Sequence, residues 1–169
     1  MKVAFLDRDG VLNSKPVDAY YVTRLDQLQL LPGAGEAIAA LIRSGYQVMV
    51  ATNQRAVARG QLSLEGLEAL HQKLQQAVRA HGGTIAQFYI CPHDEGVCNC
   101  RKPLPGMFLD AFQEHPDIDR EQSFFVGDSD SDRLAAEAAG LRFFPLQTNG
   151  NLLQCLREQG LLELERPDR

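Results

Sequence analysis

The sequence predicts an α/β fold with a doubly wound, mainly parallel sheet. Five short apolar runs rich in β-branched and aromatic residues recur along the 169 residues, and helical patterns separate them. The runs are almost continuously apolar instead of alternating, which is typical of strands buried on both faces. Because strands that alternate with helices form right-handed βαβ units, we expect one domain over residues 1–169.

Glycine, proline and capping residues mark the ends of the expected helices. Pro32-Gly33 opens a helical pattern over 34–44 that Gly45 closes, and Ser63 can cap a helix that ends before Gly82-Gly83. The expected strands span 2–6, 47–51, 86–90, 123–126 and 141–144. Further helices are expected over 105–115, 132–140 and 151–159.

Composition and charge favour small-molecule chemistry. The chain has 44% apolar and 23% charged residues, and its net charge of −5 provides no broad positive field for nucleic acid. The run VAFL is interrupted by Asp7 too early for a signal peptide, and no run approaches the length that spans a bilayer. We therefore expect a cytoplasmic monomer that binds neither nucleic acid nor membranes, with reduced cysteines.

Four of the five expected strands lead into polar segments. These segments are Asp7-Arg8-Asp9-Gly10, Thr52-Asn53-Gln54, the cysteine-rich stretch from Cys91, and Gly127-Asp128-Ser129-Asp130-Ser131-Asp132. In open parallel sheets ligands bind outside the carboxyl ends of the strands, so the four segments are expected to meet at one site. The run 141–144 ends at Pro145 without a comparable group and is expected to be a structural edge strand.

The acidic residues of these segments predict phosphoryl transfer. Asp7 and Asp9 follow one strand, where Gly10 lets the backbone approach a ligand, and Asp128 and Asp132 follow another. Clustered carboxylates need a cation, and a few oxygen ligands suit Mg²⁺, which also takes a phosphate oxygen. In such a site Asp7 can attack phosphorus, while Asp9 protonates the leaving oxygen and then activates water.

Each acidic segment also has a purely structural interpretation. Asp-x-Asp-Gly is commonly a turn, and GDSDSD can cap the helix that follows it. Both segments nevertheless follow buried strands, and Thr52-Asn53 and Lys102 supply a hydroxyl, an amide and an ammonium group for a phosphate. This coincidence favours catalysis.

Four motifs in this order, FLDRDGVLN, TNQ, a lysine followed by proline, and GDSDSD, resemble those of the haloacid dehalogenase (HAD) superfamily of phosphohydrolases. The resemblance implies a HAD-like Rossmannoid fold and a phosphoric monoester hydrolase. It implies Asp7 as the nucleophile and Asp9 as the acid/base, with Asp9 also binding the metal through its main-chain carbonyl. The other implied residues are Thr52 as a phosphate ligand, Lys102 as the charge stabiliser, Asp128 as a magnesium ligand and Asp132 as a supporting carboxylate.

The cysteine-rich stretch has the composition of a zinc site. Cys91-x-His93 and Cys98-x-Cys100 are two short chelating pairs joined by a four-residue link. Three thiolates and one imidazole complete a tetrahedral zinc shell, and a closed shell is structural because it leaves no position for water. A thioredoxin-like redox motif has two residues between its cysteines, a spacing that this stretch lacks. We expect a zinc loop inserted after a core strand, and Cys155 as a small core residue.

The pattern C-x-H, C-x-C-R-K-P resembles a narrower HAD group, the capless zinc-containing phosphatases. This group includes D-glycero-D-manno-heptose 1,7-bisphosphate 7-phosphatases and histidinol-phosphate phosphatases. The spacing also predicts that no cap domain is present, because 13–52 has room for a loop, one helix and one strand, and 53–91 for one helix and one strand. Short loops must then select the substrate.

The substrate-binding residues are carried over from the same resemblance. The segment Ala58-Arg59-Gly60 and the run RKPLPGM resemble the heptose enzymes, and the resemblance implies that Arg101, beside Lys102, contacts the substrate. The expected contacts are Asp18, Ala19, Tyr20, Tyr21, Asn53, Gln54, Arg55, Arg59, Arg101 and Lys102. Lys15, Arg55, Arg59 and Arg101 are the basic groups available for a second phosphate.

Three functional hypotheses follow. The first is a Mg²⁺-dependent phosphomonoesterase for a small phosphorylated metabolite, with a heptose bisphosphate favoured. The second is a histidinol-phosphate phosphatase, because Arg55-Ala56 replace the Ser-Gly of the heptose enzymes and the zinc link is short. The third is a non-catalytic binding module that keeps the fold and the zinc loop.

Overall fold

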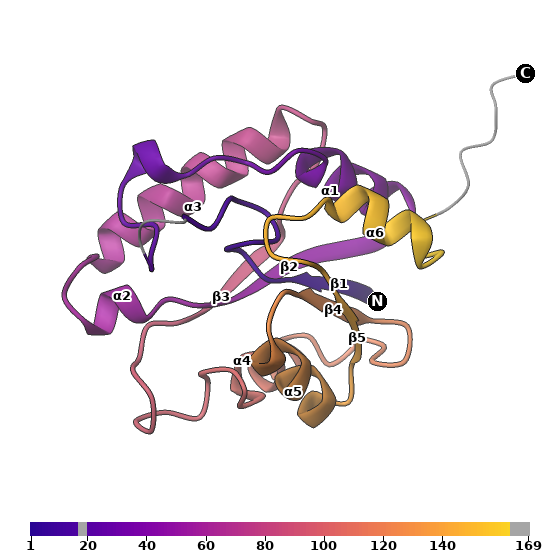
Figure 1. Ribbon diagram of the computed structural model, residues 1–169. Helices are drawn as coiled ribbons and strands as arrows, with labels where there is room; N and C mark the ends of the chain where they lie inside the picture. The colour runs from indigo at the N-terminus through magenta and orange to yellow at the C-terminus, as the bar shows by residue number, and fades with distance from the viewer. Residues whose placement is uncertain (17–19, 163–169) are drawn as a thin grey trace, which may run out of the picture.

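The computed structural model describes residues 1–16 and 20–162 and is built on a five-stranded parallel sheet with the order β3-β2-β1-β4-β5 (Figure 1). The strands are β1 Lys2–Leu6, β2 Tyr46–Asn53, β3 Gln87–Cys91, β4 Phe124–Gly127 and β5 Arg142–Pro145. The register places Leu6 opposite Val50 of β2 and Val126 of β4, so the carboxyl ends of the three central strands lie together. β5 is an edge strand, as predicted.

Helices cover both faces of the sheet, which confirms the doubly wound arrangement (Figure 1). Successive β1 residues point to opposite faces: Leu6 packs in one hydrophobic core and Phe5 in the other. The first core is covered by α1 (Ala34–Arg43), α3 (Leu64–Arg79) and α6 (Leu152–Glu158). The second is covered by α4 (Gly106–Glu114) and α5 (Asp130–Ala139).

The helix ends follow local side-chain chemistry. The Ser63 hydroxyl accepts the N–H of Gly66 at the start of α3, as the sequence predicts. α5 begins two residues earlier than expected, because Ser129 and Asp132 form a reciprocal capping box in which each side chain accepts the other's N–H. The GDSDSD segment therefore does cap the helix that follows it.

The intervals between the motifs are short, as predicted. Among the described residues, 13–52 form a 3₁₀ helix η1 (Leu25–Gln27), α1 and most of β2, and 53–91 form α2 (Arg55–Ala58), α3 and β3. The segments η1 and α2 were not expected, because each is too short for a periodic signal. Neither interval holds a cap domain within the described chain, and no helix there is long and apolar enough to cross a membrane.

Candidate active site

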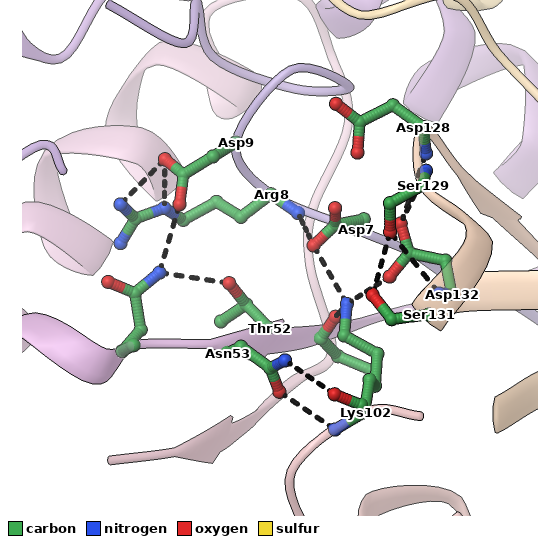
Figure 2. Close-up of polar contacts among 12 residues, drawn as sticks. Asp7, Arg8, Asp9, Thr52, Asn53, Lys102, Asp128, Ser129, Ser131 and Asp132 are labelled. Atoms are coloured by element: carbon green, nitrogen blue, oxygen red, sulfur yellow. Dashed lines mark hydrogen bonds and ion pairs between the residues drawn. The ribbon is translucent and has the colours of Figure 1, made fainter. Parts of the chain in front are cut away.

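Lys102 links the ends of three strands at the carboxyl edge of the sheet. Its Nζ lies 3.0 Å from Asp7 Oδ1, which follows β1, and 2.6 Å from Asp132 Oδ1, which follows β4 (Figure 2). It also donates to the carbonyl oxygen of Ala51 in β2 at 3.0 Å. All three polar side chains are buried, so water weakens their attraction little. Three motifs distant in the sequence thus converge, as the strand-end argument predicts.

The lysine loop is held to β2 by a reciprocal amide contact. The Asn53 side chain donates to the Lys102 carbonyl at 3.1 Å and accepts the Lys102 N–H at 3.0 Å (Figure 2). Asp132 is held similarly, because its Oδ2 accepts the N–H groups of Asp128 and Ser129 at 3.1 and 3.3 Å. The helix cap and the salt bridge use the same carboxylate, so the structural and functional interpretations of GDSDSD both apply.

Asp128 supplies another carboxylate beside Asp7. Carboxylate oxygens of Asp7, Asp128 and Asp132 all lie within 4.8 Å of one another, a spacing that fits a shared cation. Gly10 makes room for this group: its φ is +85°, and a Cβ at this position would lie 2.4 Å from Asp128 Oδ2. The Thr148 hydroxyl donates to the same oxygen at 2.8 Å. The loop after β5 therefore contributes to the site, which the sequence did not indicate.

The electrostatics of the site call for an added cation. Burial raises the pKa of Asp7 well above its usual value, Lys102 opposes this, and the carboxylates of Asp132 and Asp128 raise the pKa further. Burial lowers the pKa of Lys102, but Asp7 and Asp132 outweigh it, so the ammonium group stays charged. With all four carboxylates ionised, Asp7, Asp9, Asp128 and Asp132 carry two more charges than Arg8 and Lys102 balance, and a divalent ion offsets that difference.

Asp9 is held by a separate network that points away from Lys102 (Figure 2). Its Oδ1 accepts from Arg8 Nη2 at 2.8 Å and from Asn13 Nδ2 at 3.0 Å, and its Oδ2 accepts from Gln54 Nε2 at 3.1 Å. The Gln54 amide also donates to the Thr52 hydroxyl at 2.9 Å. Burial raises the pKa of Asp9, but Arg8 and the amide hydrogen bonds outweigh it and hold this pKa below its usual value.

Three residues of this network were missed in the sequence: Arg8, Asn13 and His71. Arg8 is fully buried, and its Nη1 lies 3.2 Å from Nε2 of His71, which α3 brings from 63 residues away. Arg8 stands inside the first motif, so its position there was the available signal. His71 had none, because a lone histidine on the apolar face of a helix looks like any core residue.

We expect the His71→Gln variant to lose less stability in acid than the wild type. Burial first, and Arg8 second, lower the pKa of His71 from 6.5 to about 3, while Asp9 opposes them. Between these values the unfolded state binds a proton that the folded state does not. The stability is therefore complete above pH 6.5 and is lost at about 1.4 kcal/mol per pH unit below it.

Glutamine does not titrate, so the two proteins should diverge as pH falls. Urea unfolding near pH 7 and pH 5 measures the difference, which we expect to reach about 2 kcal/mol. All other titrating groups are the same in both proteins, so their contributions cancel. Identical losses of unfolding free energy would contradict the prediction.

The expected zinc ligands come together in one cluster. Cys91 Sγ lies 3.6 Å from Cys98 Sγ and 3.0 Å from Cys100 Sγ, and His93 Nδ1 lies 3.3 Å from Cys100 Sγ. All four donor atoms lie within 4.8 Å of one another, and no disulfide joins the cysteines. A tetrahedral zinc ion with bonds of about 2.3 Å separates its ligands by about 3.8 Å. The cluster therefore has the size and donor set of a zinc site, and Cys155 is buried apart from it.

Four of the ten expected substrate contacts line one pocket of about 420 Å³, whereas Asn53, Gln54, Arg101 and Lys102 are not among its lining residues. Tyr20 and Tyr21 come from the segment before η1, and Arg55 and Arg59 come from α2 and the residue that follows it. Arg24 also lines the pocket and is a third arginine that was not expected there. Asp18 and Ala19 lie outside the described residues. Lys15 is exposed and does not line this pocket.

The pocket arginines are bound by an acidic residue of the zinc loop. Arg55 Nε donates to Asp94 Oδ1 at 2.6 Å, and Arg59 Nε lies 3.5 Å from Asp94 Oδ2. The side chains are partly exposed, so these ion pairs contribute little stability. They nevertheless join α2 to the zinc loop beside His93. Arg55 was expected as a free phosphate ligand; in the structure its charge is shared with Asp94.

Arg101 follows the zinc loop directly and precedes Lys102 in the chain. Its Nη1 is buried and has no hydrogen-bond partner among the described residues. A buried donor without a partner costs roughly 1–3 kcal/mol, so this N–H group is free to donate to a ligand. The site thus combines the buried Asp7 carboxylate at a strand end, its partner Lys102, further carboxylates and the Arg101 donor. This arrangement is the one expected of a HAD-type phosphatase.

Comparisons with known proteins agree with this class. Residues 2–145 match the family model described as polynucleotide kinase 3 phosphatase. A D-glycero-β-D-manno-heptose-1,7-bisphosphate 7-phosphatase from Pseudomonas putida is 49% identical over 142 residues, which cover 83% of this chain and 79% of the relative. The protein of the same name from Bordetella bronchiseptica is 42% identical over 165 residues, covering 96% and 89%.

Solved structures give the same result. The crystal structure of D,D-heptose 1,7-bisphosphate phosphatase from B. bronchiseptica, complexed with magnesium and phosphate, matches with a TM-score of 0.82 and 40% identity. The match covers 96% of this chain and 89% of that one. The chain therefore belongs to the HAD superfamily of phosphatases, in the family described as polynucleotide kinase 3 phosphatase. This membership speaks against the non-catalytic module.

Proposed function

We propose that this chain is a Mg²⁺-dependent phosphomonoesterase that removes the 7-phosphate of D-glycero-β-D-manno-heptose 1,7-bisphosphate. The observation that carries the proposal is the buried contact of Lys102 with Asp7, at 3.0 Å, beside the carboxylate cluster. Relatives that bear this name share 38–49% of their aligned residues with the chain. The proposal assigns the nucleophile to Asp7 and the proton transfers to Asp9.

Asp7, Asp128 and the main-chain carbonyl of Asp9 are the proposed magnesium ligands, with Asp132 as a supporting carboxylate. The spacing of the carboxylates and the uncompensated negative charge support this assignment. When bound, Mg²⁺ offsets the repulsion between the nucleophile and the phosphate and polarises the phosphoryl group. The four-residue Cys/His cluster is proposed to hold a structural Zn²⁺.

The protein groups account for both half-reactions. In the first, a carboxylate oxygen of Asp7 forms a bond to phosphorus, the bond from phosphorus to the sugar oxygen breaks, and that oxygen takes a proton from Asp9. In the second, Asp9 takes a proton from water as its oxygen attacks phosphorus, and the bond to Asp7 breaks. Lys102 and the Thr52 hydroxyl are proposed to contact the phosphoryl oxygens, where they stabilise developing charge.

The protonation of Asp9 must change between these steps. Its network favours the carboxylate, which is the form needed to accept a proton from water. A substrate phosphate beside Asp9 raises the pKa of this carboxyl group, because like charges disfavour ionisation. Substrate binding therefore promotes the acid form that the first step needs.

A bisphosphate needs a second anionic subsite. We assign it to Arg101, whose Nη1 is buried without a partner, and to Arg59 at the pocket that Tyr20 and Tyr21 also line. Asn53 and Gln54 are proposed to position the groups that contact the phosphate, Asn53 through its hydrogen bond to Lys102. Arg55 is proposed to serve mainly by joining α2 to Asp94.

A panel of phosphate esters tests the substrate. We expect kcat/KM for the heptose 1,7-bisphosphate to exceed that for heptose 7-phosphate at least 10-fold, because one charge-assisted contact to the second phosphate is worth about 1.4 kcal/mol. Histidinol phosphate and a DNA 3′-phosphate belong in the panel, the latter because of the family description. A higher kcat/KM for either would replace the heptose assignment. The net charge of −5 argues against the DNA substrate.

Three further assignments accompany the enzyme. We propose that residues 1–169 act as one domain, that the protein works as a monomer, and that it resides in the cytoplasm. The single sheet supports the first. The unpaired thiols support the last, because zinc-binding cysteines need a reducing compartment.

A further inference from the structure

The guanidinium group of Arg8 is buried between Asp9, its neighbour in the first motif, and His71 of α3. Its Nε and Nη2 donate to Asp9 Oδ1 at 3.3 and 2.8 Å, and its Nη1 lies 3.2 Å from His71 Nε2. A guanidinium is always charged and has only hydrogen-bond donors. Because Arg8 is fully buried, each N–H edge of its guanidinium needs an acceptor from the protein. Asp9 provides that acceptor on one side, and His71 provides it on the other.

The imidazole of His71 is itself firmly placed. The ring is 5% exposed on α3 and stacks on Phe88 of β3, with centroids 4.2 Å apart and planes inclined by 12°. Because Arg8 can only donate, Nε2 of His71 accepts and the ring proton lies on Nδ1. The burial that lowers the pKa of His71 to about 3 keeps this acceptor neutral at physiological pH.

We propose that His71 is a positioning residue for Asp9, acting through Arg8. This inference rests on the proposed function, in which Asp9 gives its proton to the leaving oxygen. His71 fixes the outer edge of the guanidinium, the guanidinium fixes Oδ1, and Asn13 and Gln54 complete the orientation of the carboxylate. His71 contacts neither the substrate nor the reacting atoms. Without it, Arg8 loses one acceptor and shifts, and the carboxyl group of Asp9 turns with it.

A pair of variants separates this role from packing. His71→Leu introduces an apolar side chain of similar size that has no hydrogen-bond acceptor. His71→Gln retains an acceptor within reach of Arg8. The substrates are the heptose 1,7-bisphosphate, whose alkoxide must be protonated as it leaves, and p-nitrophenyl phosphate, whose leaving group departs without a proton. The measured quantity is kcat/KM, which reports the first half-reaction.

We expect His71→Leu to lower kcat/KM for the heptose substrate about 10-fold, which is part of the contribution that general acid catalysis makes. The value for p-nitrophenyl phosphate, whose leaving group needs no proton, should fall less than about 3-fold. His71→Gln should restore the heptose value to within about 3-fold of the wild type. The control Leu74→Val, on the same buried face of α3, should not change the ratio between the substrates. Zinc content and circular dichroism establish that each variant is folded.

Equal losses on both substrates, or a His71→Gln variant no more active than His71→Leu, would overturn the inference while leaving the proposed function intact. If the wild type hydrolyses neither ester, the proposed function fails and the inference fails with it. Should His71→Leu not fold, His71→Met provides a second side chain without an imidazole acceptor, and the same two substrates decide the matter.

Discussion

Asp7→Asn should abolish phosphatase activity and leave the protein folded. An amide of the same shape cannot attack phosphorus, so we expect kcat to fall by about 10³-fold or more. The change removes a carboxylate whose pKa is raised by burial, so its charge is unfavourable in the folded state and its loss should not destabilise the fold. Lys102 keeps its contact with Asp132 at 2.6 Å. Zinc content and the melting temperature should therefore stay close to those of the wild type.

The measurement is phosphate release from the heptose bisphosphate with Mg²⁺ present, together with acid trapping of the phosphorylated enzyme for mass spectrometry. The wild type should carry one phosphate on the peptide that contains Asp7, and the variant none. Asp110→Asn, on the exposed side of α4, is the matched control and should be fully active. Ordinary turnover by Asp7→Asn would rule out the covalent mechanism.

Cys98→Ser should release the zinc ion and reduce activity about 10- to 100-fold, the size of effect that misplacement of a supporting group has at a site. Lys102 lies two residues after Cys100, so the zinc cluster closes the loop that places the ammonium group 3.0 Å from Asp7. The same loop carries Asp94, which binds Arg55 and Arg59 of the pocket. Loss of zinc should therefore affect both turnover and KM.

Cys155→Ala is the control for this prediction. Cys155 is also free and buried, but it packs on α6 in the other core and contributes no donor to the cluster. Its variant should lose some stability, about 1 kcal/mol for a small cavity, and keep both zinc and activity. Zinc per chain and kcat/KM are measured for both variants. A zinc-free Cys98→Ser protein with normal kcat/KM would show that the cluster does not support the lysine loop.

The strand-end segments were the most informative part of the sequence. Four of the five apolar runs ended in a polar group, and parallel pairing brings such ends to one edge, so the meeting of Asp7, Lys102 and Asp132 was predictable without coordinates. The Cys/His cluster was predictable for a simpler reason, because ten residues hold all four side chains and a short loop can close on itself. Element boundaries shifted by one or two residues where caps such as Ser129 decided them.

Three other side-chain contacts, those of Arg55, His71 and Thr148, were not predictable. Arg55 looked like a phosphate ligand until the fold placed it against Asp94, 39 residues further along the chain. His71 looked like a core residue until α3 placed its ring beside Arg8. Thr148, after an edge strand with no polar signal of its own, bonds to Asp128. In each case the partner is distant in the sequence. An arginine, histidine or threonine can pair with many kinds of polar group, so the residue type alone does not identify the partner.

Local patterns thus predicted the parallel α/β sheet, the edge of the sheet at which the motifs meet, and the four Cys/His side chains that form one cluster. They do so because apolar periodicity, capping residues and closely spaced donors act over a few residues and do not depend on the rest of the chain. The tertiary structure decided which carboxylate each cation meets, and with it the pKa values of Asp7 and Asp9. Burial and distance set these energies, and both exist only once separate helices and strands are packed together.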